Sequence, residues 1–233
     1  MRWPYISARG KLGLALAASS IASMGLYVVG DWTGHGDIFT YLPWNLLLAW
    51  LALAVALWLE AVLNRALWSS WYALFVTLVW AVSLPNAFYM VSDFTHLRDI
   101  VRVDFMYDLV LFCSFIFNGI ILGYASLFVV HRQLAKRLHP RSAFVLVELV
   151  LLLCSFAIYI GRELRWNTWD IVAHPAQLLV DVSDRVINPA AHPDATTLTF
   201  GLFVLLSTTY ITIWYAARAV RQTAHKTKAA AEK

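Results

Sequence analysis

The residues best suited to chemistry lie in one polar stretch, residues 84–108, between two long apolar segments. Its ionisable residues are Asp93, His96, Arg98, Asp99, Arg102, Asp104 and Asp108. Six charges at the centre of a bilayer would cost on the order of 15–20 kcal/mol, at roughly 3 kcal/mol each. The stretch therefore lies at a membrane surface or faces a cavity that is lined by protein.

Asp93 and His96 are the best candidates in this stretch for metal ligands or acid/base groups. They are three residues apart, so on one helical turn they would share a face. Asp108 lies where the next apolar segment begins, a position at which a carboxylate is also a good helix cap. Asn86, directly after Pro85, adds an amide that is able to bind a ligand.

A second polar cluster occupies residues 161–170. If the preceding helix continues through it, Glu163, Asn167 and Asp170 fall within about 60° of one another, and an opposite face carries arginine and tryptophan. One face would offer oxygen ligands, and the other would offer guanidinium groups suited to phosphate or carboxylate. The candidate ligand-binding residues are Asn86, Arg162, Arg165, Trp166, Asn167 and Asp170.

Four interpretations of these clusters compete. In the first, the two clusters form ion pairs with each other, in which Asp93, Asp99 or Asp104 is bonded to Arg162 or Arg165. In the second, Asp93 and His96 hold a divalent metal such as Mg, Mn or Zn. Alternatively, the arginines bind an anionic lipid or a lipid-linked head group, or an ion path passes through Asn118 and Glu148. The sequence contains no HExxH, CxxC or DxDxDG motif that would decide for a metal.

The composition predicts an all-α, polytopic integral membrane protein. Hydrophobic residues make up 61% of the 233 residues and charged residues 14%, and the mean hydropathy is +0.65. Soluble domains carry nearly twice that share of charge. We expect one transmembrane domain over residues 12–217, which begins after a short N-terminus (1–11) and precedes a basic tail (218–233). The six predicted spans are 12–29, 44–63, 67–84, 108–130, 142–161 and 198–217.

Several local features refine this expectation. The first span resembles a cleavable signal peptide, but its apolar run continues past Ser20-Ile21-Ala22, so we expect a retained helix. Asn64-Arg65 predicts a tight connection between the second and third spans, and Pro85 is expected to break or kink the third. Gly119 and Gly123 predict a helix contact face.

The segment between the fifth and sixth spans contains a short amphipathic helix over residues 175–188. Leu178, Leu179, Val182 and Val186 recur at helical spacing, and Asp181, Asp184 and Arg185 lie away from them. This pattern is typical of a helix on the membrane surface, and a helix that covers the mouth of the bundle would show the same spacing.

The basic residues predict the orientation. With both termini and the loops at 64–66 and 131–141 on one side, that side collects 13 of the 18 Lys and Arg residues. By the positive-inside rule this side is the cytoplasm, and the other side receives 11 of the 14 acids, including both polar clusters. Topology thus explains the net charge of +4, and we expect a bilayer and no nucleic acid as the partner.

The segment Leu84-Pro85-Asn86-Ala87-Phe88-Tyr89 is followed by Asp93 and then by His96-Leu97. This pattern resembles the LPNAPY…TD…HL signature of a bacterial membrane family, the domain of unknown function 1361, with Phe88 where proline is usual. The Tyr107-Asp108 and Asn118-Gly119 pairs, the 161–170 cluster, Asn188-Pro189 and Phe200-Gly201 are similar too, and the resemblance spans roughly residues 43–210. It implies a multi-pass protein of the bacterial cytoplasmic membrane and no particular reaction.

Three functions follow from these expectations. In the first, the two polar clusters form an outward-facing cap that is structural or binds a ligand. In the second, the protein is a membrane enzyme that acts on a lipid or lipid-linked phosphate, with or without a divalent metal. In the third, it is a small transporter. In the enzyme, Asp93, His96, Asp108 and Glu163 would be the metal ligands or acid/base groups. The sequence does not decide whether the protein is an enzyme.

Overall fold

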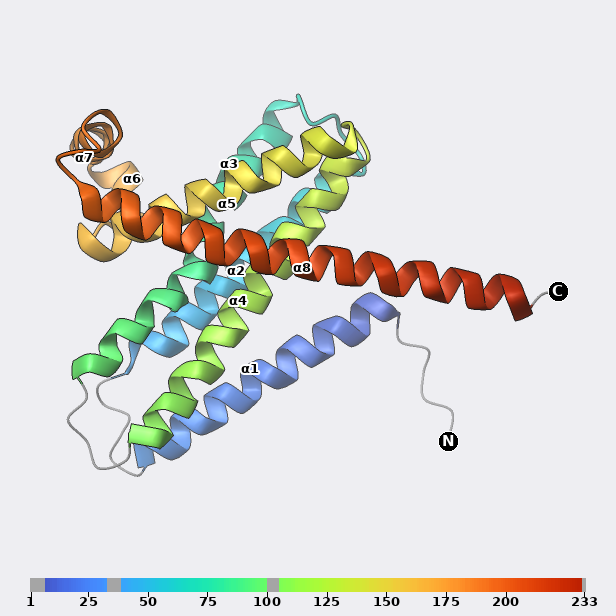
Figure 1. The fold of residues 1–233 in the computed structure, drawn as a ribbon, viewed down its shortest axis with the longest axis horizontal. Helices are drawn as coiled ribbons and strands as arrows, with labels where there is room; N and C mark the ends of the chain where they lie inside the picture. The colour runs from blue at the N-terminus through green and yellow to red at the C-terminus, as the bar shows by residue number, and fades with distance from the viewer. Residues whose placement is uncertain (1–6, 33–38, 100–104, 232–233) are drawn as a thin grey trace. The chain divides into compact units, whose positions relative to one another are not determined.

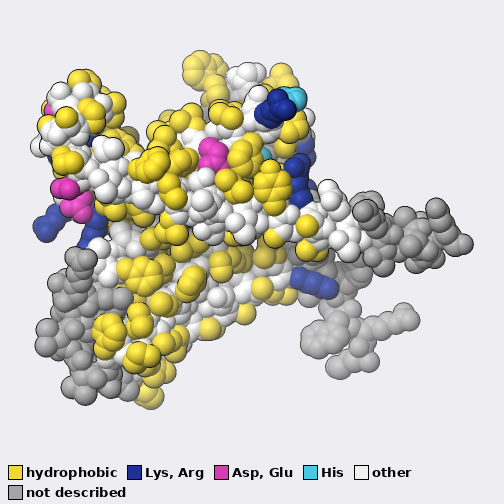
Figure 2. All heavy atoms as spheres, in the orientation of Figure 1, with side chains coloured by type: hydrophobic (Ala, Val, Ile, Leu, Met, Phe, Trp, Pro, Cys, Tyr) yellow, Lys and Arg dark blue, Asp and Glu magenta, His cyan; other side chains and the backbone are white. Residues whose placement is uncertain are grey.

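The computed structural model describes residues 7–32, 39–99 and 105–231, which form helices and connecting turns (Figure 1). The protein is all-α and polytopic, because six helices in the described part are long and apolar enough to cross a membrane. They are α1 (Ala8–Trp32), α2 (Tyr41–Leu63), α3 (Trp71–Tyr89), α4 (Phe105–Ala135), α5 (Pro140–Glu163) and α8 (Pro193–Ala231). Hydrophobic side chains are spread along the visible helical surface (Figure 2).

Three further elements lie between the spans. The 3₁₀ helix η1 (Met90–Asp99) follows α3, and α6 (Asp170–Ala173) and α7 (Pro175–Ile187) follow α5. The chain divides into two compact units, residues 1–143 and 144–233, and each is described by itself below. The single transmembrane domain over 12–217 remains a prediction.

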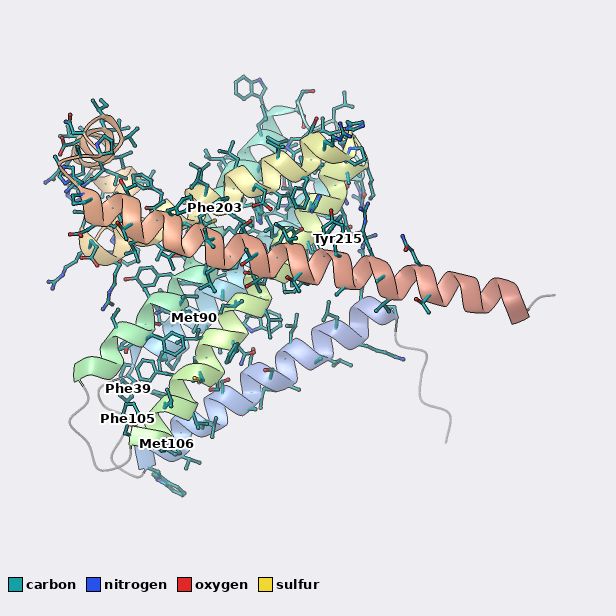
Figure 3. The ribbon with its side chains drawn as sticks, viewed as in Figure 1. Phe39, Met90, Phe105, Met106, Phe203 and Tyr215 are labelled. Atoms are coloured by element: carbon teal, nitrogen blue, oxygen red, sulfur yellow. The ribbon has the colours of Figure 1, made fainter. Side chains whose placement is uncertain are left out.

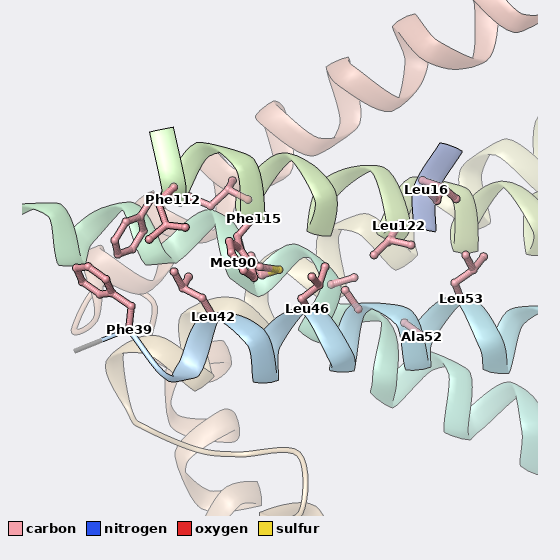
Figure 4. Packing of buried hydrophobic residues seen from close by; sticks show 14 residues of the cluster. Leu16, Phe39, Leu42, Leu46, Ala52, Leu53, Met90, Phe112, Phe115 and Leu122 are labelled. Atoms are coloured by element: carbon pink, nitrogen blue, oxygen red, sulfur yellow. The ribbon is translucent and has the colours of Figure 1, made fainter. Parts of the chain in front are cut away.

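In the first unit, α2 packs against α3 and α4, and α1 packs against α4 (Figure 1). An apolar cluster joins these helices and η1; it includes Phe39, Leu42, Leu46, Met90, Leu111, Phe112 and Phe115 (Figure 4). The Gly119–Gly123 contact face is confirmed. A Cβ at Gly119 would lie 2.5 Å from Met90 Sδ and 2.8 Å from Ala87 O, and one at Gly123 would lie 2.7 Å from the Phe88 ring.

Helix α3 differs from its predicted form at both ends. It begins at Trp71 and not near Leu67, because the Ser70 hydroxyl accepts a hydrogen bond from Ala73 N at 3.3 Å and caps the helix. The connection after α2 is therefore longer than Asn64-Arg65 alone. Pro85 does not break the helix, which continues to Tyr89 before it tightens into η1. Membrane helices tolerate such a proline because neighbouring groups satisfy the carbonyl it leaves without a partner.

In the second unit, α7 packs against the ends of the two spanning helices. Tyr159 and Ile160 of α5 and Ala195 of α8 form a small buried cluster, against which Leu178 and Val182 of α7 pack. Helix α8 continues as one helix from its span into the basic tail (Figure 1). The predicted short amphipathic helix between the fifth and sixth spans is confirmed as α7.

Candidate functional site

Two carboxylates are buried in the first unit. Asp93, in η1, is 1% exposed, and Asp108, in the first turn of α4, is 0% exposed. Asn45, in the second turn of α2, donates from Nδ2 to Asp93 Oδ2 at 3.2 Å. A polar contact therefore ties η1 to α2.

Each of these three residues lies within three positions of a member of the same apolar cluster. Leu46 follows Asn45, Met90 lies three residues before Asp93, and Leu111 lies three residues after Asp108; all three apolar residues belong to the cluster. Figure 4 shows Met90 and Phe112 between α2 and α4, and Figure 3 shows that Phe39 and Phe105 mark the same end of the unit. We call Asn45, Asp93 and Asp108 the carboxylate site. The sequence analysis missed Asn45, because one asparagine near the start of a span resembles an ordinary helix boundary.

Of the other candidate residues in this stretch, the structure describes the side chain of Asn86. Asn86 is half-buried in α3 and donates from Nδ2 to Ser83 O at 3.2 Å. The side chain of His96, and residues 100–104, lie outside the described residues. Among the residues that the structure describes, no group of three or more His, Cys, Asp or Glu side chains could hold a metal ion. The Asp93–His96 metal site thus stays a prediction.

The second polar cluster does not continue α5. The helix ends at Glu163, and Arg165 has a φ of 58°, in the left-handed region. A left-handed residue commonly terminates a helix, although glycine is usual there. The two expected faces therefore do not form. One was to carry Glu163, Asn167 and Asp170, and the other Arg162, Arg165 and Trp169. Glu163 and Arg165 are exposed, and Arg162 is half-buried.

Bonds within the second unit engage Trp166, Asn167 and Asp170 of this cluster instead. Trp166 Nε1 donates to Asp181 Oδ2 at 2.8 Å, and Asp170 Oδ2 accepts from Asn167 N at 2.7 Å. His174 Nδ1 lies 3.3 Å from Asp170 Oδ1. Here the acids come from α6 and α7, whereas the ion-pair interpretation had named Asp93, Asp99 and Asp104. The named pairs therefore stay a prediction, and the side chain of Asp99 and residue Asp104 lie outside the described residues.

Helix α7 is bonded on its acidic side as well. Arg185 Nη1 lies 3.4 Å from Asp181 Oδ1, and Asp184 Oδ2 lies 2.7 Å from His192 Nε2. Asn188 Nδ2 donates to Asp184 Oδ1 at 2.9 Å. We call these bonds, with those of Trp166 and Asp170, the α7 network. They fix α7 to the loops on either side of it.

We predict that the α7 network weakens at acid pH. The backbone N–H of Asn167 and then His174 hold the pKa of Asp170 below its usual value, and Asn188 and then His192 do the same for the pKa of Asp184. Carboxylates with a lowered pKa stabilise the folded form above their unfolded pKa of about 3.9 and lose this effect as the pH falls through the folded pKa.

Hydrogen–deuterium exchange at pH 6 and pH 3, corrected for intrinsic rates, measures this effect. Amides of residues 167–192 should lose protection at pH 3, while those in the middle of α2 should keep it. The Asp184→Asn variant should show a smaller difference between the two pH values. Equal protection of residues 167–192 at both pH values would contradict the prediction.

A buried acid that the sequence analysis missed lies at the other end of the first unit. Glu60, in α2, is 8% exposed and accepts two hydrogen bonds from Arg9, Nη1 to Oε2 and Nη2 to Oε1, both at 3.0 Å. Gln133 Nε2 donates to Glu60 Oε1 at 3.1 Å, and Arg137 Nη1 donates to Gln133 Oε1 at 2.9 Å. We call these four residues the Glu60 network. The sequence signal that could have identified Glu60 is a single acid within an otherwise apolar span.

The two residues proposed for an ion path make local bonds. Asn118 Nδ2 donates to Ser23 Oγ at 2.7 Å and to Ser19 O at 3.2 Å, which links α4 to α1. Glu148 Oε2 accepts from Ser207 Oγ at 2.6 Å, which links α5 to α8. Each therefore has an interhelical role in its own unit, and the path between them stays a prediction.

The fold and the buried polar groups define a class: an all-α, multi-pass membrane protein with carboxylates enclosed at one end of a helical unit. The chain belongs to the family described as "Protein of unknown function (DUF1361)", whose model matches residues 44–213. This confirms the resemblance stated from the sequence, and the match contains the carboxylate site and the α7 network. No curated protein and no solved structure matches the chain.

Proposed function

We propose that the protein binds a cationic ligand at the carboxylate site, in the bacterial cytoplasmic membrane with both termini in the cytoplasm. The observation that carries the proposal is the burial of Asp93 and Asp108, at 1% and 0% exposure, in a membrane-spanning unit. Carboxylates are costly to bury in such a unit, so each is by default a candidate for binding a ligand or an ion. The location rests on the charge of the loops and on the family resemblance.

The chemistry of the site favours a hard cation. Two carboxylates and an amide are the oxygen donors that Mg²⁺ and Mn²⁺ prefer. With the imidazole of His96 as a further ligand, a borderline ion such as Zn²⁺ becomes equally suitable. The α7 network joins its acids to residues in the loops on either side of α7, so we assign it an architectural role.

Cation binding should appear as a gain in thermal stability. Protein purified in detergent and stripped with chelator would be titrated with Mg²⁺, Mn²⁺ and Zn²⁺, since a cation at 100 times its Kd stabilises the folded form by about 2.7 kcal/mol. We expect a rise in Tm for one of these ions, and we expect Asp93→Asn and Asp108→Asn to remove it. Loss of the rise in His96→Ala would place the imidazole in the site.

The matched control is Asp194→Asn, which removes an exposed acid from the first turn of α8. It should keep the full rise in Tm. No rise with any of the three ions, or an equal rise in the wild type and both carboxylate variants, would refute the cation site.

Cysteine labelling tests the proposed orientation. The starting variant lacks Cys113 and Cys154. In the proposed orientation, Ala190→Cys places a thiol at an exposed position on the non-cytoplasmic side, and Asn64→Cys places one at an exposed position in the cytoplasm. A membrane-impermeant maleimide should label Ala190→Cys in spheroplasts and Asn64→Cys only after lysis. The reverse pattern would overturn the orientation.

A lipid-linked phosphate is the second candidate ligand, and the conformation of Arg165 favours it. Arg165 is exposed beside Trp166 and keeps a left-handed φ of 58° that glycine adopts at lower cost. Arg165→Gly should therefore keep or raise the Tm and reduce the amount of anionic phospholipid that co-purifies, measured by mass spectrometry. Unchanged phospholipid would remove this candidate.

A further inference from the structure

Helix α7 turns its charged side chains inward and its apolar side chains outward. Asp181, Asp184 and Arg185 take part in the α7 network, on the side that faces the rest of the second unit. Large apolar side chains lie on the opposite side and are 63–73% exposed: Leu179 64%, Val180 68%, Val186 63% and Ile187 73%. A helix on the surface of a soluble protein shows the reverse arrangement.

The exposed side of α7 forms one arc without a charge. At about 100° per residue, its members fall within an arc of roughly 120°. They are Ala176, Leu179, Val180, Ser183, Val186 and Ile187. Leu178 and Val182 lie on the packed side, against Tyr159, Ile160 and Ala195. The apolar residues that the sequence placed on one face therefore divide between a packed face and an exposed one.

The connections of α7 keep it close to the membrane. Residues 188–192 alone separate its last residue from Pro193, where the spanning helix α8 begins, and at about 3.5 Å per residue they reach roughly 20 Å at most. Residues 164–174 tie its other end to the spanning helix α5. The neighbouring α6 adds further exposed apolar groups, with Trp169 at 60% and Val172 at 86%. Tryptophan is the residue typical of the membrane–water boundary.

We propose that the outward arc of α7 is inserted into the lipid bilayer, at the boundary between head groups and acyl chains. The occupant is lipid because the arc has no charge or amide to pair with a protein partner, and because short connections join α7 to two helices that are long and apolar enough to cross a membrane. The α7 network then lies on the side of the helix away from the acyl chains. The bilayer and the inward bonds together hold α7 parallel to the membrane.

Spin labelling in lipid nanodiscs tests the proposal. A nitroxide at Leu179→Cys or Ile187→Cys, in a variant without Cys113 and Cys154, should collide more with oxygen, which concentrates in lipid, than with a water-soluble nickel chelate. The control is Gln177→Cys, an exposed position on the other side of the same helix. We expect the oxygen-to-nickel collision ratio to be at least fivefold higher at 179 and 187 than at 177.

Each other outcome overturns the proposal in a distinct way. Equal ratios at 177, 179 and 187 would show that the arc faces water. Low collision with both reagents at 179 and 187 would show that protein covers the arc, either a second copy of the chain or another subunit. Val180→Cys and Val186→Cys sample the same arc and replace any variant that does not elute as folded protein.

Discussion

Replacing Gly119 with leucine is expected to lower the stability of the first unit by about 3 kcal/mol, the upper part of the range for overpacking. Even a Cβ would lie 2.8 Å from the carbonyl oxygen of Ala87, a backbone atom that cannot move without a shift of α3, and 2.5 Å from Met90 Sδ. Leucine adds three further carbons to the same contact. In detergent, the Tm should fall by roughly 5–10 °C.

The size and position of the new side chain provide the controls. Gly119→Ala should cost less than Gly119→Leu, since the Met90 side chain can adjust. Gly25→Ala and Gly201→Ala place a methyl group where no heavy atom lies within 4 Å, so they should leave the Tm unchanged or raise it. A Tm for Gly119→Leu equal to that of Gly25→Ala would show that α3 and α4 do not pack at this contact in the folded protein.

This contact shows what local sequence can predict. Glycines four residues apart in an apolar segment allow close approach of a second helix, so Gly119 and Gly123 indicated a contact face without any knowledge of the partner. The partner itself, Phe88 and Met90 just after Pro85, depends on how α3 and η1 lie against α4. Hydropathy likewise predicted the number of spanning helices, but it placed the start of α3 at Leu67, since it does not sense the Ser70 cap.

The candidate site was harder to predict, because it depends on side chains from distant segments. Asp93 and Asp108 were named as candidates from their types and from the cost of placing them in lipid, and the structure buries both. Asn45 bonds to Asp93 from 48 residues away, and no spacing rule links the two. The predicted fifth span, 142–161, ends close to the end of α5 at Glu163, but its possible continuation through residues 161–170 does not occur. Arg165 adopts a left-handed conformation that favours glycine, so its residue type did not signal this.

The α7 segment shows a different limit. Periodicity identified the helix correctly, but it assigned one apolar face and one polar face, whereas the folded helix has a packed face, a bonded acidic face and an exposed apolar face. The hydrogen bond from Trp166 to Asp181 turns the acids inward. Periodicity alone therefore predicts that a helix is amphipathic, whereas the hydrogen bonds of its polar side decide which of its apolar residues remain exposed.

The Glu60 network should account for the second large effect on stability. Glu60→Ala removes an acceptor that is 8% exposed and leaves the amide of Gln133 without it, so we expect a loss of about 2–3 kcal/mol, the upper part of the range for hydrogen bonds to a charged group. Arg9→Ala should cost less, about 1–2 kcal/mol, because 61% of the Arg9 side chain is exposed and solvent screens its charge. Thermal unfolding in detergent measures both losses.

A double-mutant cycle separates the pair from the rest of the network. If Arg9 and Glu60 are coupled as the structure shows, the double variant should be less destabilised than the sum of the two single variants. Arg65→Ala removes an exposed arginine from the turn after α2 and should have almost no effect. Equal losses for Arg9→Ala and Arg65→Ala would contradict the prediction.

The same network predicts that α1 stays attached to the mature protein. Cleavage after Ala22 would remove Arg9 from Glu60, Ser20 from the Trp50 indole, and Ser19 from the Asn118 amide, and so leave buried polar groups without their partners. The mass of the intact protein purified from membranes should therefore include residues 8–22. A mature chain that begins after Ala22 and keeps the Tm of the full chain would show that α1 does not stabilise the fold through these contacts.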